Sequence, residues 1–193
     1  MLENLKNYKI LLCSKSPRRR ELLADLRIPF TVVTAGDVKE NYPDTLPPID
    51  VPQFLSEQKA EAYRGIMKDG ELLITADTLV ICENEILGKP HDADEAVAML
   101  KKLSGKTHQV ATGVTLTTLR KRVSFTTVTD VKFAELTDEI IRYYVDTFQP
   151  YDKAGAYGIQ EWIGCVAVES IRGSFYNVMG LPVHQLYRQL SLF

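Results

Sequence analysis

Three consecutive arginines, Arg18, Arg19 and Arg20, stand at the expected start of a helix. Ser16 is a suitable N-cap for that helix, and Pro17 is a suitable first helical residue. A helix N-terminus already carries about half a positive charge, so arginines in the first turn are unfavourable there. A bound anion removes the conflict, because the exposed N–H groups, the dipole and the guanidinium groups all attract it. The pattern favours a phosphate site; arginines that simply extend into water are the alternative.

Asp77 is the acid whose surroundings most strongly indicate chemistry. It stands between two apolar runs, 72–76 and 78–82, where a buried and unpaired charge would cost several kcal/mol. A buried Asp77 needs a cation, and the nearby sequence offers Lys89, held between Gly88 and Pro90, or a divalent metal. The alternative is an exposed turn or bulge residue at a strand end.

The segment 151–160 combines small residues with two tyrosines and ends in Gln160. Such a segment leaves room for a flat group to lie against the backbone. The amide of Gln160 offers a donor and an acceptor together, which is what reading the imide or amide edge of a base requires. A surface loop with an incidental glutamine is the alternative interpretation.

Composition places the chain among ordinary globular proteins. It has 193 residues, of which 45% are hydrophobic and 25% charged, and a net charge of −2. That balance gives no support for nonspecific nucleic-acid binding, so anion affinity must be local. We expect no nucleic-acid partner and no membrane association, since no apolar run is long enough to span a bilayer. Cys13, Cys82 and Cys165 lie in apolar stretches, which predicts buried free thiols and a cytoplasmic location.

The periodicity of the chain alternates between strand and helix patterns, which predicts an α/β fold with a mixed central sheet flanked by helices. Strands are expected at 10–13, 30–33, 108–119, 123–134 and 164–171, and an apolar run at 72–76 ends at Asp77-Thr78, resumes at 79–82 and returns at 86–87 after a turn. Helices are expected at 17–26, 54–67, 92–103, 137–148 and 182–190. The polar, proline-bearing segment 36–52 is long for a connection, which indicates a functional or lid-like loop.

An ordered set of short motifs resembles the Maf family of nucleoside triphosphate pyrophosphatases over nearly the whole chain. The motifs are Ser14-x-Ser16-Pro17-Arg18-Arg19-x-Glu21-Leu22-Leu23, Gln58-Lys59-Ala60, Ala76-Asp77-Thr78, Gly88-Lys89-Pro90, Thr112-Gly113-Val114, Asp152-Lys153-Ala154-Gly155 and the closing run 173–182. Each motif is weak alone, but their order is specific. The context of Gln160 is similar to the branch of the family that acts on dTTP and UTP.

The resemblance implies a fold, an activity and partners. The fold would be a single domain over 1–193, elongated and two-lobed, with a cleft, of the kind shared with inosine triphosphatases. The activity would be hydrolysis of dTTP and UTP to the monophosphate and pyrophosphate, with Mg²⁺ or Mn²⁺. The protein would form a homodimer.

The resemblance also implies roles for individual residues. Asp77 matches the catalytic acid, which accepts a proton from the attacking water and lies close to the metal. The residues that match triphosphate-holding positions are Arg18, Lys59 and Lys89, with Ser16 and Arg19 from the same signature also expected at the substrate. The positions associated with substrate choice are Arg18, Thr78 and Gln160. Glu40 is the best match for a second carboxylate near the metal.

Two departures from the family pattern stand out. Glu161 follows Gln160 where many members have glycine, and an added carboxylate near a base pocket could alter selectivity. The acids Asp37 and Glu40 are separated rather than adjacent, which makes the assignment of Glu40 less direct. Two other functions remain open: a pyrophosphatase for a modified or purine nucleotide, and a nucleotide-binding cell-division regulator with little turnover.

Overall fold

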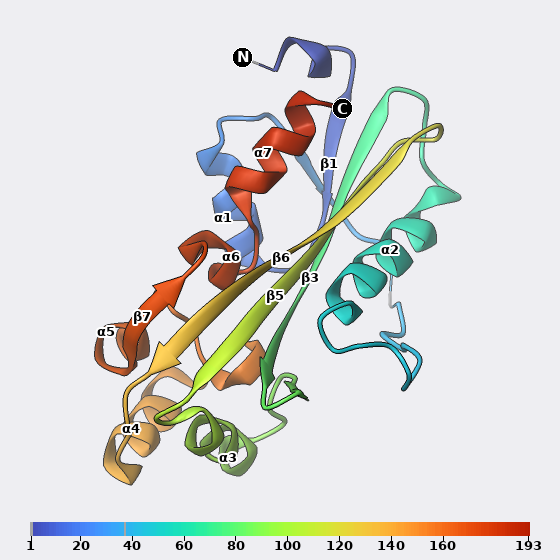
Figure 1. The fold of residues 1–193 in the computed structure, drawn as a ribbon. Coiled ribbons are helices and arrows are strands. Elements are labelled where there is room, and N and C mark those ends of the chain that lie inside the picture. The colour runs from blue at the N-terminus through green and yellow to red at the C-terminus, as the bar shows by residue number, and fades with distance from the viewer. Residues whose placement is uncertain (1, 37) are drawn as a thin grey trace. The chain divides into compact units, whose positions relative to one another are not determined.

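The computed structural model describes residues 2–36 and 38–193 and contains a seven-stranded sheet (Figure 1). The strands are β1 Lys9–Cys13, β2 Thr31–Val33, β3 Glu71–Cys82, β4 Glu85–Leu87, β5 Thr107–Thr117, β6 Arg122–Phe133 and β7 Val168–Arg172. Their order is β2-β1-β3-β5-β6-β7, with β4 paired to β3. Strand β1 pairs in parallel with β2 and β3, whereas β3–β4 and β6–β7 are antiparallel. The predicted mixed α/β sheet flanked by helices is confirmed.

The helices are α1 Pro17–Asp25, α2 Val51–Arg64, α3 Ala93–Leu103, α4 Asp138–Phe148, α5 Trp162–Ala167, α6 Phe175–Met179 and α7 Val183–Ser191, with short 3-10 helices at Glu3–Leu5 and Ala154–Ala156. The chain divides into two compact units. The first unit comprises Met1–Asp77, Thr112–Thr127 and Gly180–Phe193, and the second comprises Thr78–Ala111 and Val128–Met179. The single-domain assignment and the cleft stay predictions.

In the first unit, α1 begins as its sequence predicts. The Ser16 side chain accepts a hydrogen bond from the N–H of Arg19, and Pro17 occupies the first turn. The strand before it, β1, runs beside β3 with Cys13 opposite Thr75. The start of α1 therefore follows the carboxyl end of a parallel strand, where open α/β sheets bind ligands.

Helix α2 packs against β3 and β5 of the first unit through buried hydroxyl groups. Thr75 Oγ1 donates to the Ser56 carbonyl at 2.7 Å, and the hydroxyls of Ser56 and Thr115 lie 2.7 Å apart. On β5, a Cβ at Gly113 would lie 2.2 Å from the backbone N of Gln53. Only a residue without a side chain allows α2 to approach β5 this closely, which gives the Thr-Gly-Val motif a structural reason.

Apolar contacts complete this packing. Leu11 and Leu73 from the sheet meet Ala60, Tyr63 and Met67 in one buried cluster. Helical spacing places Ala60 and Tyr63 on the α2 stripe that faces the sheet. The same stripe carries Lys59, so the core contacts that hold α2 also hold the side chain predicted to bind phosphate.

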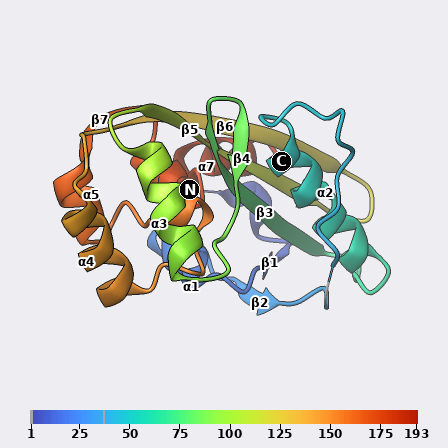
Figure 2. The same cartoon turned by 90° about the horizontal axis from the view of Figure 1, so that it is seen from below.

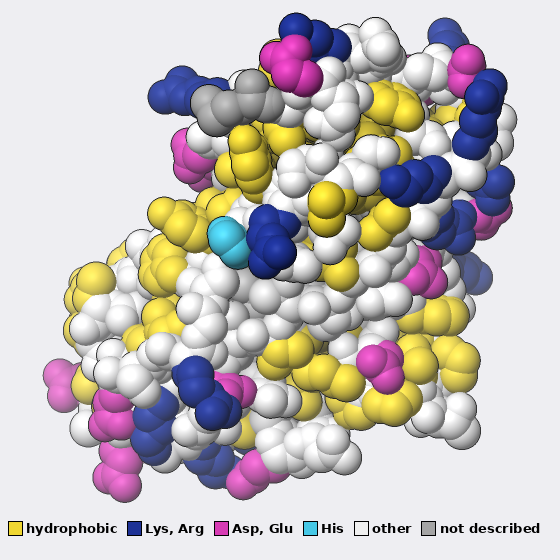
Figure 3. Space-filling model, turned by 45° about the horizontal axis from the view of Figure 1, so that its top comes forward, with side chains coloured by type: hydrophobic (Ala, Val, Ile, Leu, Met, Phe, Trp, Pro, Cys, Tyr) yellow, Lys and Arg dark blue, Asp and Glu magenta, His cyan; other side chains and the backbone are white. Residues whose placement is uncertain are grey.

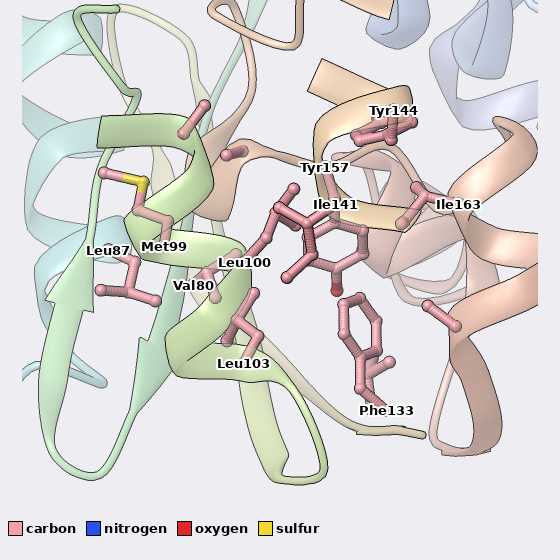
Figure 4. Close-up of a cluster of buried hydrophobic side chains, with 14 of the residues drawn as sticks. Val80, Leu87, Met99, Leu100, Leu103, Phe133, Ile141, Tyr144, Tyr157 and Ile163 are labelled. Atoms are coloured by element: carbon pink, nitrogen blue, oxygen red, sulfur yellow. The ribbon is translucent and has the colours of Figure 1, made fainter. Parts of the chain in front are cut away.

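The second unit has its own core. Figure 4 shows side chains from α3, α4, the sheet and the segment after the 3-10 helix Ala154–Ala156 pointing toward one another, among them Leu100, Leu103, Ile141, Phe133 and Tyr157. Helices α3 and α4 lie side by side (Figures 1 and 2). Their starts follow the sequence pattern, because the side chains of Asp92 and Thr137 accept hydrogen bonds from the N–H groups of Glu95 and Ile140, respectively.

Two predicted elements were wrong in detail. The chain is helical over α5, Trp162–Ala167, where a strand beginning at Gly164 was expected, and only β7 is extended. Short apolar runs do not distinguish strand from helix by periodicity. The apolar run expected to end at Asp77-Thr78 is instead continuous in strand β3, and Asp77 within it is 7% exposed, so the exposed-turn alternative is excluded.

The surface agrees with the composition. On the face in Figure 3, basic and acidic side chains are interspersed among apolar and polar ones. In the described residues, no helix is long and apolar enough to cross a bilayer. Cys13 and Cys82 are buried free thiols as expected, but Cys165 is exposed, because it lies on the outer side of α5 rather than in a buried strand.

Candidate functional site

Asp77 meets its cation on α2. Lys59 Nζ donates to Asp77 Oδ1 at 2.5 Å, and the two side chains are only 18% and 10% exposed. The contact follows from two periodicities: Thr75 and Asp77 share one face of β3, and Ser56 and Lys59 share one face of α2. The pair Thr75–Ser56 and the pair Asp77–Lys59 are successive contacts between these two faces. The buried acid of the sequence therefore has a partner, and that partner is Lys59.

Glu40 approaches the same lysine from the long polar segment. Its Oε1 lies 2.8 Å from Lys59 Nζ, and its side chain is 52% exposed. Lys59 Nζ thus bridges one buried and one half-exposed carboxylate. Glu40 and Asp77 thus contact the same lysine, although nothing in their sequence spacing requires it, and their assignment to a metal stays a prediction. Asp37 lies outside the described residues.

Gln58 anchors the segment that carries Glu40. Its Nε2 donates to the carbonyl of Asn41, the residue after Glu40, at 2.8 Å. The Gln58-Lys59-Ala60 motif is visible in the sequence, but the family resemblance implies a role only for its lysine. Each residue now has a separate contact: Gln58 holds the loop, Lys59 bridges the carboxylates, and Ala60 packs in the core.

Arg19 ties the start of α1 to the strand of Asp77. Its Nη1 donates to the Ala76 carbonyl at 2.9 Å, and its Nε donates to the Gly180 carbonyl at 2.8 Å. Loss of hydration lowers the pKa of Arg19, an effect that the charge of Asp77 opposes; an arginine stays protonated all the same. These contacts direct two of its donors to the protein itself, while its assignment to the substrate stays a prediction.

Arg18 and Ser16 occupy the first turn beside Arg19. Arg18 is half-buried, whereas Arg20 is exposed and donates to the Lys15 carbonyl at 3.0 Å. The contact of Arg19 with Ala76 places this helix start next to Asp77. The first unit therefore brings together an N-terminal helix turn, a half-buried arginine, Lys59 and two carboxylates.

This donor set fits a magnesium or manganese ion. Mg²⁺ is commonly held by one or two carboxylates together with substrate phosphates, rather than by a cage made only of protein groups. Glu40 and Asp77 supply two carboxylates around one point, and Lys59 Nζ, a cation, lies at that point. Among the described residues no group of three or more His, Cys, Asp or Glu side chains converges, and a divalent metal at this point stays a prediction.

The remaining predicted site residues belong to the second unit. Thr78 follows Asp77 on β3 and is half-buried, while Lys89 and Gln160 are exposed. Gly155 N–H donates to the Gly88 carbonyl at 2.9 Å, so the segment leading to Gln160 contacts the turn that carries Lys89. The roles of all three residues in substrate binding stay predictions.

Comparisons with known proteins find relatives that match the chain over its whole length. A protein 56% identical over 191 residues, from Bacteroides thetaiotaomicron, is named dTTP/UTP pyrophosphatase, and 99% of each chain is covered. A second, from Parabacteroides distasonis, has the same name and is 55% identical over 193 residues, with 100% of each chain covered. A solved structure of a nucleoside-triphosphatase, a dITP/XTP pyrophosphatase from Mycobacterium abscessus, aligns with a TM-score of 0.43 and 14% identity over 94% of this chain and 93% of that one.

The match to a protein family covers the same span as the motifs. The family model described as Maf-like protein matches residues 9–193, which include every motif from the serine–proline–arginine signature to the closing run. Together with relatives of 55–56% identity over their full length, this match shows that the chain belongs to the Maf family.

Proposed function

We propose that this protein is an enzyme that hydrolyses dTTP and UTP to the monophosphate and pyrophosphate. The observation that carries the proposal is Lys59 Nζ held between Asp77 and Glu40, next to a helix start that bears Arg18. Binding alone does not require carboxylates beside a phosphate site, whereas hydrolysis needs a group that accepts a proton from water. Full-length relatives named dTTP/UTP pyrophosphatase support the choice of substrate.

The proposed reaction is attack of water on the α-phosphorus. Asp77 orients the water and accepts its proton. Negative charge develops on the phosphoryl oxygens and on the leaving pyrophosphate, and Lys59, Arg18 and Lys89 stabilise it. The N–H groups at the start of α1 add to this stabilisation because they are oriented before the substrate arrives.

A divalent ion, Mg²⁺ or Mn²⁺, completes the proposed site. Glu40 and Asp77 would hold it, and it would neutralise phosphate charge and activate the water. Lys59 then has a second role: it balances the two carboxylates, which lie close together, when the metal is absent. A cytoplasmic location and a homodimer also belong to this proposal.

In the second unit, Gln160 and Thr78 are proposed to select the base. The amide of Gln160 can donate to one carbonyl oxygen and accept from the imide N–H of uracil or thymine. Cytosine has an acceptor at N3 in place of that N–H, so the amide in this orientation makes these two contacts only with uracil or thymine. Gln160 is exposed, which leaves its amide accessible to a ligand.

The test is a nucleotide panel with pyrophosphate detection in Mg²⁺ or Mn²⁺. The full chain should release pyrophosphate from dTTP and UTP well above the purine triphosphates, and should yield the monophosphate. Asp77→Asn should lower kcat by about 10²–10⁴-fold, the usual contribution of a general base. Asp69→Asn changes an exposed aspartate in the turn before β3 and should leave kcat unchanged.

The panel also separates the alternatives. Equal or greater turnover of a purine or modified nucleotide would transfer the proposal to that substrate. Tight binding of dTTP without hydrolysis in either metal would favour a nucleotide-binding regulator. Near wild-type turnover by folded Asp77→Asn would remove Asp77 from the mechanism.

A further inference from the structure

We propose that Glu161 is a positioning residue that fixes the turn presenting Gln160, and that it does not itself read the base. This inference rests on the proposed function, in which Gln160 contacts the pyrimidine. It also replaces the expectation from sequence that an extra carboxylate at this position would alter base selectivity.

Gln160 stands out from its neighbours by exposure. The five residues before it, 155–159, are all buried, and Glu161 after it has a side chain only 22% exposed. The chain therefore projects a single polar side chain from an otherwise buried segment. Such a projection needs support directly beneath it, because a surface glutamine in a loose turn would sample many orientations.

Both carboxylate oxygens of Glu161 are engaged by the protein. Lys153 Nζ lies 3.1 Å from Oε1, and the Tyr144 hydroxyl donates to Oε2. Lys153 is itself only 9% exposed at its side chain and also contacts Asp152 Oδ1 at 2.7 Å. Both oxygens of Glu161 are therefore bonded within the protein, which directs this carboxylate to the support of the turn rather than to a base.

Tyr144 connects this carboxylate to the backbone of the turn. Its Oη accepts a hydrogen bond from Gly158 N–H at 3.1 Å while donating to Glu161. Its ring lies in the buried cluster of Figure 4, next to Ile163. Burial, together with the hydrogen bond to Glu161, raises the pKa of Tyr144, so the hydroxyl keeps its proton and remains a donor.

The backbone of Gly158 lies directly against the ion pair of Glu161 and Lys153. A Cβ at Gly158 would lie 2.9 Å from Glu161 Cδ and 3.1 Å from Lys153 Cε, so this glycine crosses directly over the two side chains. Glu161 N–H donates to the Gly158 carbonyl at 3.0 Å, which closes a turn with Gln160 inside it. A Cβ at Gly164 would lie 1.8 Å from the Ile159 carbonyl oxygen, so the start of α5 is packed equally tightly.

The same segment supports the turn of Lys89. Gly155, with φ of 67°, donates its N–H to the Gly88 carbonyl. Glu161 and Tyr144 therefore hold a continuous piece of chain that presents Gln160 and braces the backbone before Lys89. Loosening it should weaken nucleotide binding without removing any group from the chemical step.

The experiment compares Glu161→Gln and Tyr144→Phe with wild type and with Glu169→Gln, which changes an exposed glutamate on β7. Amide hydrogen exchange of residues 157–161 without nucleotide is the first readout. Loss of a hydrogen bond to a charged group should speed exchange by about tenfold. The control variant should leave exchange unchanged.

The second readout is the dependence of pyrophosphate release on substrate concentration. Both variants should raise KM for dTTP and UTP by about tenfold and leave kcat within about twofold, since uniform binding is lost. The ratio of dTTP to UTP turnover should stay constant. Combining the two substitutions should give less than the sum of their separate effects, because the two side chains contact each other.

Three results would overturn the inference: unchanged exchange at 157–161, faster exchange with an unchanged KM, or a changed ratio of dTTP to UTP to CTP with unchanged exchange. The last result would mean that Glu161 reads the base. Absence of dTTP and UTP turnover in the wild type would instead refute the proposed function. The exchange measurement would then decide by itself whether Glu161 fixes the turn.

Discussion

Lys59 and Lys153 each contact two carboxylates, one lysine in each unit, yet their surroundings differ. Lys59 on α2 binds Asp77, 18 residues away on β3, and Glu40 from a long loop. Lys153 binds its neighbour Asp152 and Glu161, and a tyrosine hydroxyl also contacts Glu161. The first cluster joins three separate segments. In the second, the lysine and both carboxylates lie on one short segment, 152–161, which Tyr144 of α4 contacts.

The difference indicates what each cluster is for. A lysine whose partners come from separate segments, one of them a half-exposed loop residue, can exchange those partners for phosphate oxygens or a metal. A lysine enclosed by its own turn and by a buried tyrosine loses hydrogen bonds if it moves. The same residue types therefore indicate a binding site in one unit and a structural support in the other.

Replacing Lys59 tests this comparison most strongly, because we expect it to cause the largest loss of activity. Lys59→Gln keeps a hydrogen-bond donor for Asp77 but removes the charge available to phosphate. We expect kcat/KM for dTTP to fall by about 10²–10³-fold, as when one transition-state donor is lost. Lys153→Gln should instead raise KM modestly with little change in kcat. Equal losses of kcat in both variants, measured by pyrophosphate release, would contradict the assignment of different roles to Lys59 and Lys153.

Gly113→Ala tests whether close packing of α2 holds the first cluster together. The new methyl group would meet the backbone of Gln53 at 2.2 Å. We expect a loss of about 3 kcal/mol in the free energy of unfolding, the upper end for overpacking, together with reduced activity. Gly65→Ala, at the other end of α2, meets nothing within 4 Å and should be neutral or slightly stabilising in denaturant titrations. Similar values for both variants would contradict the packing argument.

A buried histidine in the second unit should make the stability of the protein depend on pH. His108 in the second unit is 1% exposed, its Nε2 lies 2.8 Å from the Tyr157 hydroxyl, and its Nδ1 has no partner among the described residues. Burial lowers the pKa of His108 to about 4 from 6.5. The unfolded chain therefore binds more protons between these values, so stability is present above pH 6.5 and falls as the pH drops toward 4.

The loss over that window should approach about 3 kcal/mol, since one pKa unit corresponds to about 1.4 kcal/mol. His108→Gln can still hydrogen-bond to Tyr157 but does not titrate. Denaturant titrations from pH 7 to pH 4 should show a shallower decline for this variant than for wild type. Parallel curves would exclude His108 as a source of the pH dependence.

The smallest expected effects distinguish the roles of two adjacent arginines, Arg18 and Arg19. Arg19→Lys removes the planar group that contacts the Ala76 and Gly180 carbonyls and should lower the free energy of unfolding by about 1.5–3 kcal/mol. Arg18→Lys should change it by less than about 0.5 kcal/mol and should raise KM for dTTP instead. Thermal unfolding and initial rates on both variants would show the two effects, and a reversal would exchange the two roles.

Much of this architecture could be predicted from sequence because its signals are local. The N-caps Ser16, Asp92 and Thr137 each use their own side chain on the next turn. The strand at Ile10–Cys13 and the mixed α/β class follow from short-range periodicity. The helix at Trp162–Ala167 was missed because six residues with apolar side chains on both sides carry too little periodicity to exclude a strand.

The site was only partly predictable, because its contacts join residues that are far apart in the sequence. Apolar flanks indicated that Asp77 is buried and needs a cation, but chain proximity pointed to Lys89. The contact is with Lys59 because the faces of β3 and α2 meet in register, which depends on the packing of Gly113 and Ser56. The roles of Gln58, Arg19 and Glu161 likewise depend on which carbonyl or cation tertiary packing places within reach.

By itself, the sequence determined the residue types that are proposed to do the chemistry, the starts of several helices, and through its ordered motifs the family. These depend on neighbours one to four residues apart or on the identity of side chains. Only the tertiary structure decided which lysine meets which acid. Charge attraction acts over a few ångströms in space, and a distance of 18 residues along the chain leaves that spacing undefined until helix and sheet have packed.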